Sequence, residues 1–306
     1  MPRRYLQALS VIVVVAVIFL ALPRFYSNQS FLFNLMLYLG LAEGVNIIYG
    51  FTGYLPFGYV GFFGAGAYGS AIAIAFWHIS PFICVILGGL AAVAIGIVLI
   101  PLLRLSGAYF AIANLAASQA LYLIVANPSM EKITQGPYGI DLSSVYNANA
   151  AYYAMLAVLV FAMVVVACIR NSDFGLCLLA IKEDRITASL AGVNVVRARS
   201  IAWMLSAFVA GLCGGAFGWF TAVFYPSTVF SLDVSVFTIV FALFGGVGTL
   251  AGPLVGALLL YSMYNFIGIS TPQYFQLFYG FLIIGLVLFL PDGIASILQK
   301  GKIYVP

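Results

Sequence analysis

Long apolar runs separated by short polar, glycine-rich or proline-rich breaks make up nearly all of this chain. Runs such as 151–169 and 275–290 lack the period-two alternation typical of transmembrane β-strands. A backbone inside a bilayer must satisfy its own hydrogen bonds, so continuous apolar runs predict membrane-spanning helices. Cutting the chain at charges, prolines and polar clusters predicts ten spans, at about 10–22, 31–49, 59–77, 82–103, 107–126, 151–169, 201–222, 234–249, 252–269 and 274–290.

Composition supports the same interpretation. Hydrophobic residues make up 64% of the 306 residues and charged ones only 7%, against roughly 25% charged in soluble domains. A chain with so few charged side chains cannot form the polar surface that a water-soluble protein of this size needs. We therefore expect an all-α, polytopic membrane protein of about ten transmembrane helices, with residues 1–306 forming one transmembrane domain. Its surroundings are a lipid bilayer, and no nucleic-acid partner is expected.

The positions of the basic residues predict the orientation. With the N-terminus inside and the spans alternating, ten of the twelve Lys and Arg residues fall on the cytoplasmic side. Only Arg24 and Lys132 fall outside. Both termini are therefore predicted to be cytoplasmic, and the loop 127–150 periplasmic. Spans 2–5 and 7–10 would start from opposite faces, which permits an inverted repeat, although the two halves show no convincing sequence similarity.

Charge is concentrated in the stretch 172–199, which holds seven of the twenty charged side chains. Ser172 or Asp173 can cap a helix there and Gly192 can end it, so the pattern predicts one amphipathic helix. Two interpretations are open: a surface helix resting on lipid headgroups, or a helix that fits a groove on a partner protein. The predicted apolar face consists of Leu179, Ile186 and Leu190.

The segment G-L-C-L-L-A-I-K-E-D-R-I-T-A-S-L-A-G-V-N (175–194) resembles the cytoplasmic loop of permease subunits in branched-chain amino acid ABC importers. The family's Gly-containing loop couples these permeases to their ATPases. Other blocks of the family appear in the right order over about residues 31–298. They are N-I-I-Y-G-F-T-G-Y-L-P-F-G-Y-V-G-F-F-G-A-G-A-Y (46–68), R-L-S-G-A-Y-F-A-I (104–112), I-T-Q-G-P-Y-G-I (133–140), F-G-G-V-G-T-L-A-G-P-L-V-G-A (244–257) and P-D-G-I (291–294).

The resemblance implies a transmembrane permease subunit of an ATP-driven importer in the bacterial inner membrane. Its implied partners are a second, related permease, two ABC ATPases and a periplasmic solute-binding protein. The ATPases would bind ATP, so no cofactor, metal or catalytic residue is expected on this chain. The implied solute is a branched-chain or other amino acid, with urea, short amides or another small organic solute as the alternative. The residues implied to couple to the ATPase are Lys182, Glu183, Asp184, Arg185, Ala188 and Gly192.

The chain departs from the family in the second block. The usual Gln, Ser and His are Tyr54, Pro56 and Tyr59 here, so a different transported molecule is expected if these positions touch solute or shape the passage. The stretch 50–58 is rich in Gly and Pro and cannot form a regular helix. Non-helical backbone at membrane depth lines a cavity or is shielded by protein, but the stretch can equally be an ordinary cytoplasmic turn.

A second break is predicted at 245–253, and it lacks the Lys of a phosphate-binding loop. Glu43 is an acid inside a span, where a charge is costly; it is expected to pair with Asn46 or a partner subunit, with a proton site as the alternative. Polar groups such as Asn114 either join helices or line a passage. The candidate translocation path is Glu43, Asn46, Thr52, Gly53, Tyr54, Pro56, Tyr59, Asn114, Gly246, Gly248 and Thr249.

Two other classes of function compete with the importer subunit. A stand-alone carrier or channel would need ionisable groups inside the membrane, and Glu43 is the one clear acid there. A membrane enzyme would need clustered Asp, His or Cys. The four cysteines lack C-x-x-C spacing, and the chain has a single histidine. The sequence therefore favours the importer subunit.

Overall fold

Eight helices long and apolar enough to cross a bilayer dominate the described part of the chain. The computed structural model describes residues 2–77, 79–270, 277, 280, 281, 284, 285, 293 and 294. The long helices are α1 (Pro2–Ala21), α2 (Gln29–Val45), α3 (Val60–Trp77), α4 (Pro81–Val98), α5 (Gly107–Val125), α7 (Ala148–Arg170), α10 (Val195–Thr221), α12 (Leu232–Gly245) and α13 (Ala251–Ser270). The eight candidate spans fall on the first eight of these, and α13 is the ninth long helix among the described residues. The first nine predicted spans all fall on these helices, which confirms the all-α membrane fold. The tenth span, 274–290, and the block 291–294 lie largely outside the described residues.

Short elements connect the long helices. The short helices are α6 (Glu131–Thr134), α8 (Asp173–Glu183), α9 (Arg185–Leu190) and α11 (Pro226–Val229). A π-helical turn, η2 (Asn46–Gly50), continues α2. The 3-10 turns are η1 (Leu22–Arg24), η3 (Ile100–Arg104), η4 (Pro128–Met130), η5 (Gly136–Tyr138) and η6 (Ser143–Val145). Two short strands, β1 (Ile140–Asp141) and β2 (Val223–Phe224), pair antiparallel.

Several long helices begin at a polar side chain that caps them. The first backbone N–H groups of a helix have no partner within it, so a side-chain oxygen just before the helix satisfies one of them. Asn28 accepts from Phe31 N at the start of α2, Asn147 from Ala150 N at α7, and Asn194 from Arg197 N at α10, each at 3.0 Å. These caps explain where the three helices begin.

The centre of the bundle is the trio α3, α4 and α10, which pack against one another more extensively than any other helices. Their backbones approach closely because glycines face each other; a Cβ added at Gly66 would collide with the backbone of Gly211. Trp203 on α10 packs edge-on against Phe62 and donates from Nε1 to the Gly96 carbonyl at 2.9 Å. The indole therefore ties all three helices together.

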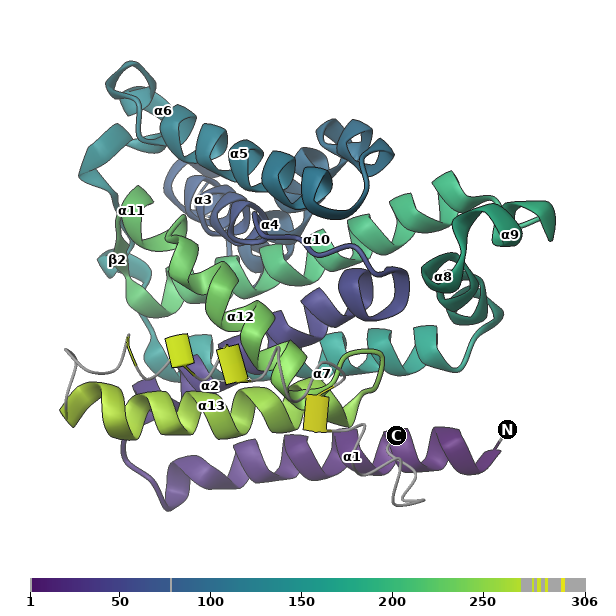
Figure 1. Ribbon diagram of the computed structural model, residues 1–306. Coiled ribbons are helices and arrows are strands. Elements are labelled where there is room, and N and C mark those ends of the chain that lie inside the picture. Colours follow the sequence, from purple (N-terminus) through teal and green to yellow (C-terminus); the bar gives the residue numbers. More distant parts are fainter. Residues whose placement is uncertain are drawn as a thin grey trace.

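A second group of helices, α2, α7, α12 and α13, packs beside this trio (Figure 1). Helix α2 contacts α7, α10, α12 and α13, and most of its residues are buried. Helices α5 and α1 lie at opposite edges of the bundle in Figure 1 and expose most of their surface. Helix α2 is therefore the inner element of this group.

Contacts among the loops sort the helix ends into two groups. At one end, Tyr5 donates to the Asn171 carbonyl. At the other, Tyr152 donates to the Phe19 carbonyl, and Gln29 donates to Asn149. The β1–β2 pair joins the loop 127–150 to the end of α10 at this second end. The predicted alternation of the helices is consistent with these contacts.

The prediction of one helix over the charged stretch is wrong. Two helices, α8 and α9, form there because the chain leaves helical geometry at Asp184, with φ −152° and ψ 114°. The Asp184 carboxylate caps the second helix instead of continuing the first. The last residues of the stretch also belong to α10, which begins at Val195 and not near 201.

Candidate functional site

The first predicted break is real and follows α2 directly. The helix loosens into the π-helical turn η2, and the chain leaves helical geometry at Gly53, whose φ is +76°. Thr52 still belongs to the last helical turn and donates to the Ile48 carbonyl. Further on, Gly58 N donates to Asn114 Oδ1 of α5 at 2.7 Å. Asn114 therefore supports the broken segment and does not face open space.

The second break lies between α12 and α13. Gly246 and Gly248 have φ values of +102° and +87°, which favour glycine. The Thr249 hydroxyl donates to the Gly246 carbonyl and accepts from Gly252 N, at 3.1 and 3.0 Å. One threonine thus closes the turn and starts the next helix.

Asn46 joins the two breaks through its side-chain amide. Its Nδ2 donates to the Thr249 carbonyl at 2.8 Å, and its Oδ1 accepts from Gly248 N at 2.7 Å. The backbones of Gly50 and Gly248 are in direct contact here, because a Cβ added at Gly50 would lie 2.7 Å from Gly248 N. Segments some 200 residues apart in the chain therefore form one buried polar junction.

Glu43 belongs to this junction and is fully buried. Its Oε2 accepts from Asn46 Nδ2 at 3.2 Å, which confirms the predicted pairing. Its Oε1 has no hydrogen-bond partner within the described part of the chain. A buried acid is costly unless it is paired or shielded. Glu43 is accordingly placed among the other polar groups of the junction, which are those of Asn46, Gly248 and Thr249.

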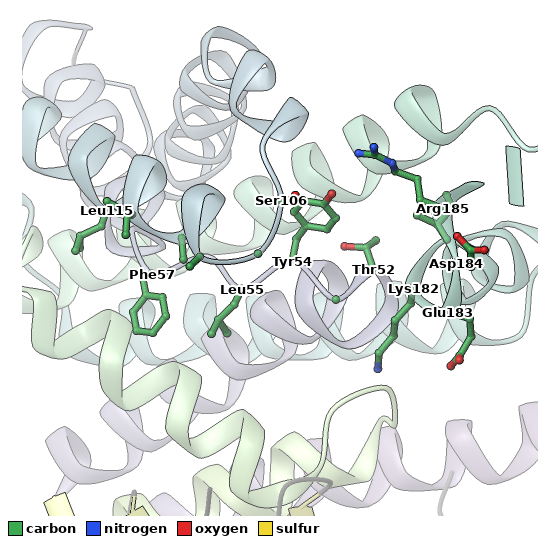
Figure 2. A pocket seen from close by; sticks show the side chains of 16 residues that line it. Thr52, Tyr54, Leu55, Phe57, Ser106, Leu115, Lys182, Glu183, Asp184 and Arg185 are labelled. Carbon is green, nitrogen blue, oxygen red and sulfur yellow. The ribbon is translucent and has the colours of Figure 1, made fainter. Parts of the chain in front are cut away.

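A cavity of about 850 Å³ opens beside the first break. Thr52, Gly53 and Tyr54 line one wall, and the beginning of α5 and the end of α8 line the others. Figure 2 shows apolar Leu115, Phe57 and Leu55 toward one end and the charged side chains of the α8–α9 turn at the other. The charged residues on this cavity are Lys182, Glu183, Asp184 and Arg185.

Lys182 connects the charged stretch to the first break. Its Nζ donates to the Gly50 carbonyl at 3.0 Å. That carbonyl ends the helix formed by α2 and η2, where the helix dipole favours a positive charge. One hydrogen bond therefore connects α8 to Gly50, the residue that packs on the second break.

The three residues that depart from the family pattern have different surroundings. Tyr54 lines the cavity, and the Arg199 guanidinium stacks 3.6 Å over its ring. Tyr59 is buried and donates to the Ser206 carbonyl of α10 at 3.0 Å, and Pro56 is buried as well. Tyr54 is therefore the departure that faces the cavity, whereas Tyr59 and Pro56 pack inside the bundle.

Sequence reasoning missed two serines that hold this region together. Ser206 donates to the Gly44 carbonyl at 2.6 Å, and Ser235 accepts from Val60 N at 2.8 Å. They satisfy backbone groups on either side of the first break. Serines in apolar helices carry only a weak sequence signal, because most serve ordinary helix contacts.

The coupling residues named from the sequence occupy distinct places in the α8–α9 region. The side chains of residues 182–185 line the cavity, Ala188 is buried, and Gly192 ends the region with a φ of +90°. The Asp184 carboxylate accepts from Ile186 N and from the Thr187 hydroxyl. Both hydrogen bonds hold the pKa of Asp184 below its ordinary value, with the Thr187 contact the larger cause.

The region also exposes apolar side chains to its surroundings. Leu176, Leu179, Ile186 and Leu190 are all exposed, the last by 84%. They include the predicted apolar face of Leu179, Ile186 and Leu190. Figure 1 places α8 and α9 at one end of the bundle. An exposed apolar surface of this kind is typical of a contact site.

Comparisons with known proteins agree on one family. A family model described as "Branched-chain amino acid transport system / permease component" matches residues 28–287. The high-affinity branched-chain amino acid transport system permease protein LivM of Salmonella typhimurium is 25% identical over 291 residues, which cover 85% of this chain and 68% of that protein. LivM of Escherichia coli strain K12 matches equally well. LivH of Salmonella typhimurium is 33% identical over 109 residues, covering 36% of this chain and 32% of that protein. No solved structure matches the chain significantly.

Proposed function

Because the chain belongs to the permease family of branched-chain amino acid ABC transport systems, we propose that it is one transmembrane subunit of an ATP-driven importer. Its solute is a branched-chain amino acid or another small amino acid. The related proteins LivM and LivH are named as permeases of one transport system. We therefore propose that this chain pairs with a second, related permease in the bacterial inner membrane.

The observation that carries the proposal is the hydrogen bond from Lys182 to the Gly50 carbonyl. It links an exposed, charged region to a break in a buried helix. A stand-alone carrier has no need of such a region. A subunit driven by a partner needs a docking surface together with a connection from that surface into the membrane, and this chain has both.

The ATPase is proposed to contact the exposed side of α8 and α9, where Leu176, Leu179 and Glu183 are accessible. Apolar side chains on a short helix suit a groove on a partner protein. ATP is bound by the two ATPase subunits. This chain supplies the lever, by which we mean the contact of α8 with the end of α2 that carries the movement of the ATPases into the membrane. The solute-binding protein is proposed to dock at the opposite end, on the loop 127–150.

The translocation path is proposed to run along the cavity beside Thr52 and Tyr54 and past the junction at Asn46. Broken helices place free backbone groups beside a solute path in many transporters. The junction is closed in this structure, because Asn46 bonds both Gly248 and Thr249. Opening the path requires these contacts to exchange.

Co-purification tests the proposed assembly. The chain is expressed with its candidate ATPases, and we expect them to elute together. Glu183→Arg reverses an exposed charge on the docking side, and Gly192→Trp places a bulky side chain where φ is +90°. Both are expected to abolish the association while leaving the permease folded.

The matched control is Lys132→Glu, a charge reversal in the loop at the other end. It is expected to leave ATPase association unchanged. Solute flux through vesicles that contain only this chain would refute the importer proposal and favour a carrier or channel.

Transport competition then identifies the solute. The reconstituted importer is supplied with labelled leucine, and unlabelled valine, urea and short amides compete. Competition by valine alone supports a branched-chain amino acid. Competition by urea or amides supports the alternative solutes. The departure from the family pattern at Tyr54 would then belong to a path for a different solute.

A further inference from the structure

A second cavity, of about 600 Å³, lies between η3, α9 and the start of α10. Three arginines line it, Arg104, Arg185 and Arg199, and no acidic side chain of the described residues does. The neighbouring Asp184 is engaged by Ile186 N and the Thr187 hydroxyl. A cavity of this size is in the range of small-molecule sites, and its charge selects an anion.

Arg199 is the buried member of the three, with 4% exposure. Its guanidinium stacks over Tyr54 and donates to the Leu103 carbonyl. Its Nε has no hydrogen-bond partner among the residues that the structure describes. Arginine keeps its charge in proteins, so a buried guanidinium with an unsatisfied donor favours an anionic ligand. Phosphate oxygens match its geometry particularly well.

The surroundings of the cavity place it where helices leave the membrane. Helix α4 ends in exposed apolar Ile97 and Val98 just before η3, and Val196 at the start of α10 is 73% exposed. Ile100, Pro101 and Leu190 also line the cavity, so part of its wall is apolar. The positive-inside bias assigns this end to the cytoplasm. Basic pockets between helices at this level are typical sites for anionic lipid headgroups.

We propose that the Arg104–Arg185–Arg199 cavity binds the phosphate-bearing headgroup of an anionic phospholipid from the inner leaflet. The acyl chains lie along the exposed apolar ends of α4 and α10. The lipid is favoured over an acidic segment of a partner protein because the cavity combines cations with apolar walls beside the lipid-facing end of α4. The bound headgroup also holds Arg199 against Tyr54, on the wall of the first cavity.

Native mass spectrometry of the full chain in detergent tests this proposal. The chain is purified with phosphatidylglycerol or with phosphatidylcholine, and the lipids retained are counted. We expect preferential retention of phosphatidylglycerol. Arg104→Gln and Arg185→Gln are each expected to lower that retention about fivefold. Arg199→Gln is not used as the main variant, because it also removes the contacts to Leu103 and Tyr54.

Arg197→Gln is the matched control, since Arg197 is exposed on α10 and does not line the cavity. It is expected to retain phosphatidylglycerol like the parent chain. Equal retention of the two lipids, or an equal loss in Arg197→Gln, would overturn the proposal, because retention would then reflect diffuse surface charge.

Two further arms separate other anions from the lipid. Inorganic phosphate at the same concentration should not displace phosphatidylglycerol; displacement would assign the cavity to free phosphate. The same variants are then tested for ATPase co-purification. Loss of ATPase association with unchanged lipid retention would assign the cavity to the ATPase. Thermal unfolding of each variant in detergent verifies that the fold is intact.

Discussion

Asn46 satisfies groups on three neighbours with a single amide: the Glu43 carboxylate, the Gly248 N–H and the Thr249 carbonyl. Asn46→Ala would leave these buried groups without that partner. Each such group costs about 1–3 kcal/mol when left unsatisfied. We expect the variant to lower the free energy of unfolding by at least about 2 kcal/mol, measured by thermal unfolding in detergent.

Asn34→Ala is the matched control on the same helix. Within the described part of the chain, the Asn34 side chain donates to the Ser30 carbonyl one turn away and to no other group. Its loss is expected to change the unfolding free energy by less than about 0.5 kcal/mol. Equal effects of the two substitutions would show that the junction does not depend on Asn46.

Asp184 sets the boundary between α8 and α9. Its cap stabilises α9 while the carboxylate is ionised, so Asp184→Ala should speed hydrogen exchange of the α9 amides severalfold. Glu183→Ala removes the adjacent exposed carboxylate but no cap, and it should leave the exchange unchanged. Unchanged exchange in Asp184→Ala would show that α9 forms without the cap.

The same cap predicts a pH dependence. The pKa of Asp184 is lowered in the folded protein, so the ionised carboxylate stabilises α9 above its ordinary pKa. This stabilisation is lost as the pH falls through the lowered pKa, below about pH 4. The protection factors of the α9 amides, which correct for the intrinsic pH dependence of exchange, should therefore fall on acidification in the parent chain and respond less in Asp184→Ala.

Between elements, the contact of α8 with the end of α2 is the proposed lever. Lys182→Met removes the hydrogen bond to Gly50 and the charge at that helix end. We expect the transport rate of the reconstituted importer to fall about three- to tenfold, because charged hydrogen bonds are among the stronger ones. ATPase co-purification is expected to persist, since Lys182 points at Gly50 and not at the docking side.

Lys182→Arg keeps a cation within reach of the carbonyl and should recover part of the rate. Arg197→Met removes an exposed cation without a contact to α2 and serves as the second control. If Lys182→Met instead releases the ATPase, the residue belongs to the docking surface and the lever is elsewhere.

The long helices could be predicted from the sequence, because an apolar run of spanning length has few other stable conformations in a bilayer. The division of the charged stretch could not. Asp184 has the same sequence signal whether it lies inside a helix or caps one. The packing of α8 on the bundle decides between these two positions. The start of α10 at Val195 could not be predicted for a related reason: Arg197 and Arg199 interrupt the apolar pattern of the span, although arginine is tolerated at a helix end near the membrane surface.

For the site, the two glycine-rich breaks and the Glu43–Asn46 pair could be predicted because their residue types are rare inside a membrane. Their meeting could not, since nothing in the sequence shows that Asn46 contacts Gly248 and Thr249. Tyr59 and Asn114 were predicted on the path; the structure shows them supporting backbone within the bundle. A solute path is a property of shape, which a single sequence does not record.

At the scale of the whole molecule, the predicted orientation can be tested by labelling. Tyr138→Cys, in the loop 127–150, should react with a membrane-impermeant maleimide added to whole cells. Leu190→Cys, on α9, should react only after the inner membrane is permeabilised. Both side chains are well exposed in the isolated chain, so the chain is expressed without its candidate ATPases, and the side of the membrane then decides which position reacts.

The parent chain controls for its own thiols, of which Cys168 is exposed and Cys177 partly exposed. Labelling of Leu190→Cys in intact cells would show that the orientation of the chain in the membrane is the reverse of the predicted one. It would also place the proposed ATPase surface on the wrong side of the membrane.

The glycine contact between α3 and α10 limits how the molecule can move. Two backbones that touch without intervening side chains cannot slip along each other, because the next residue in register would bring a side chain into a backbone. We therefore expect helices α3, α4 and α10 to move as one rigid unit. Relative motion during a transport cycle is then expected in the neighbouring group that contains α2, α12 and α13, bending where Gly53 and Gly246 interrupt it.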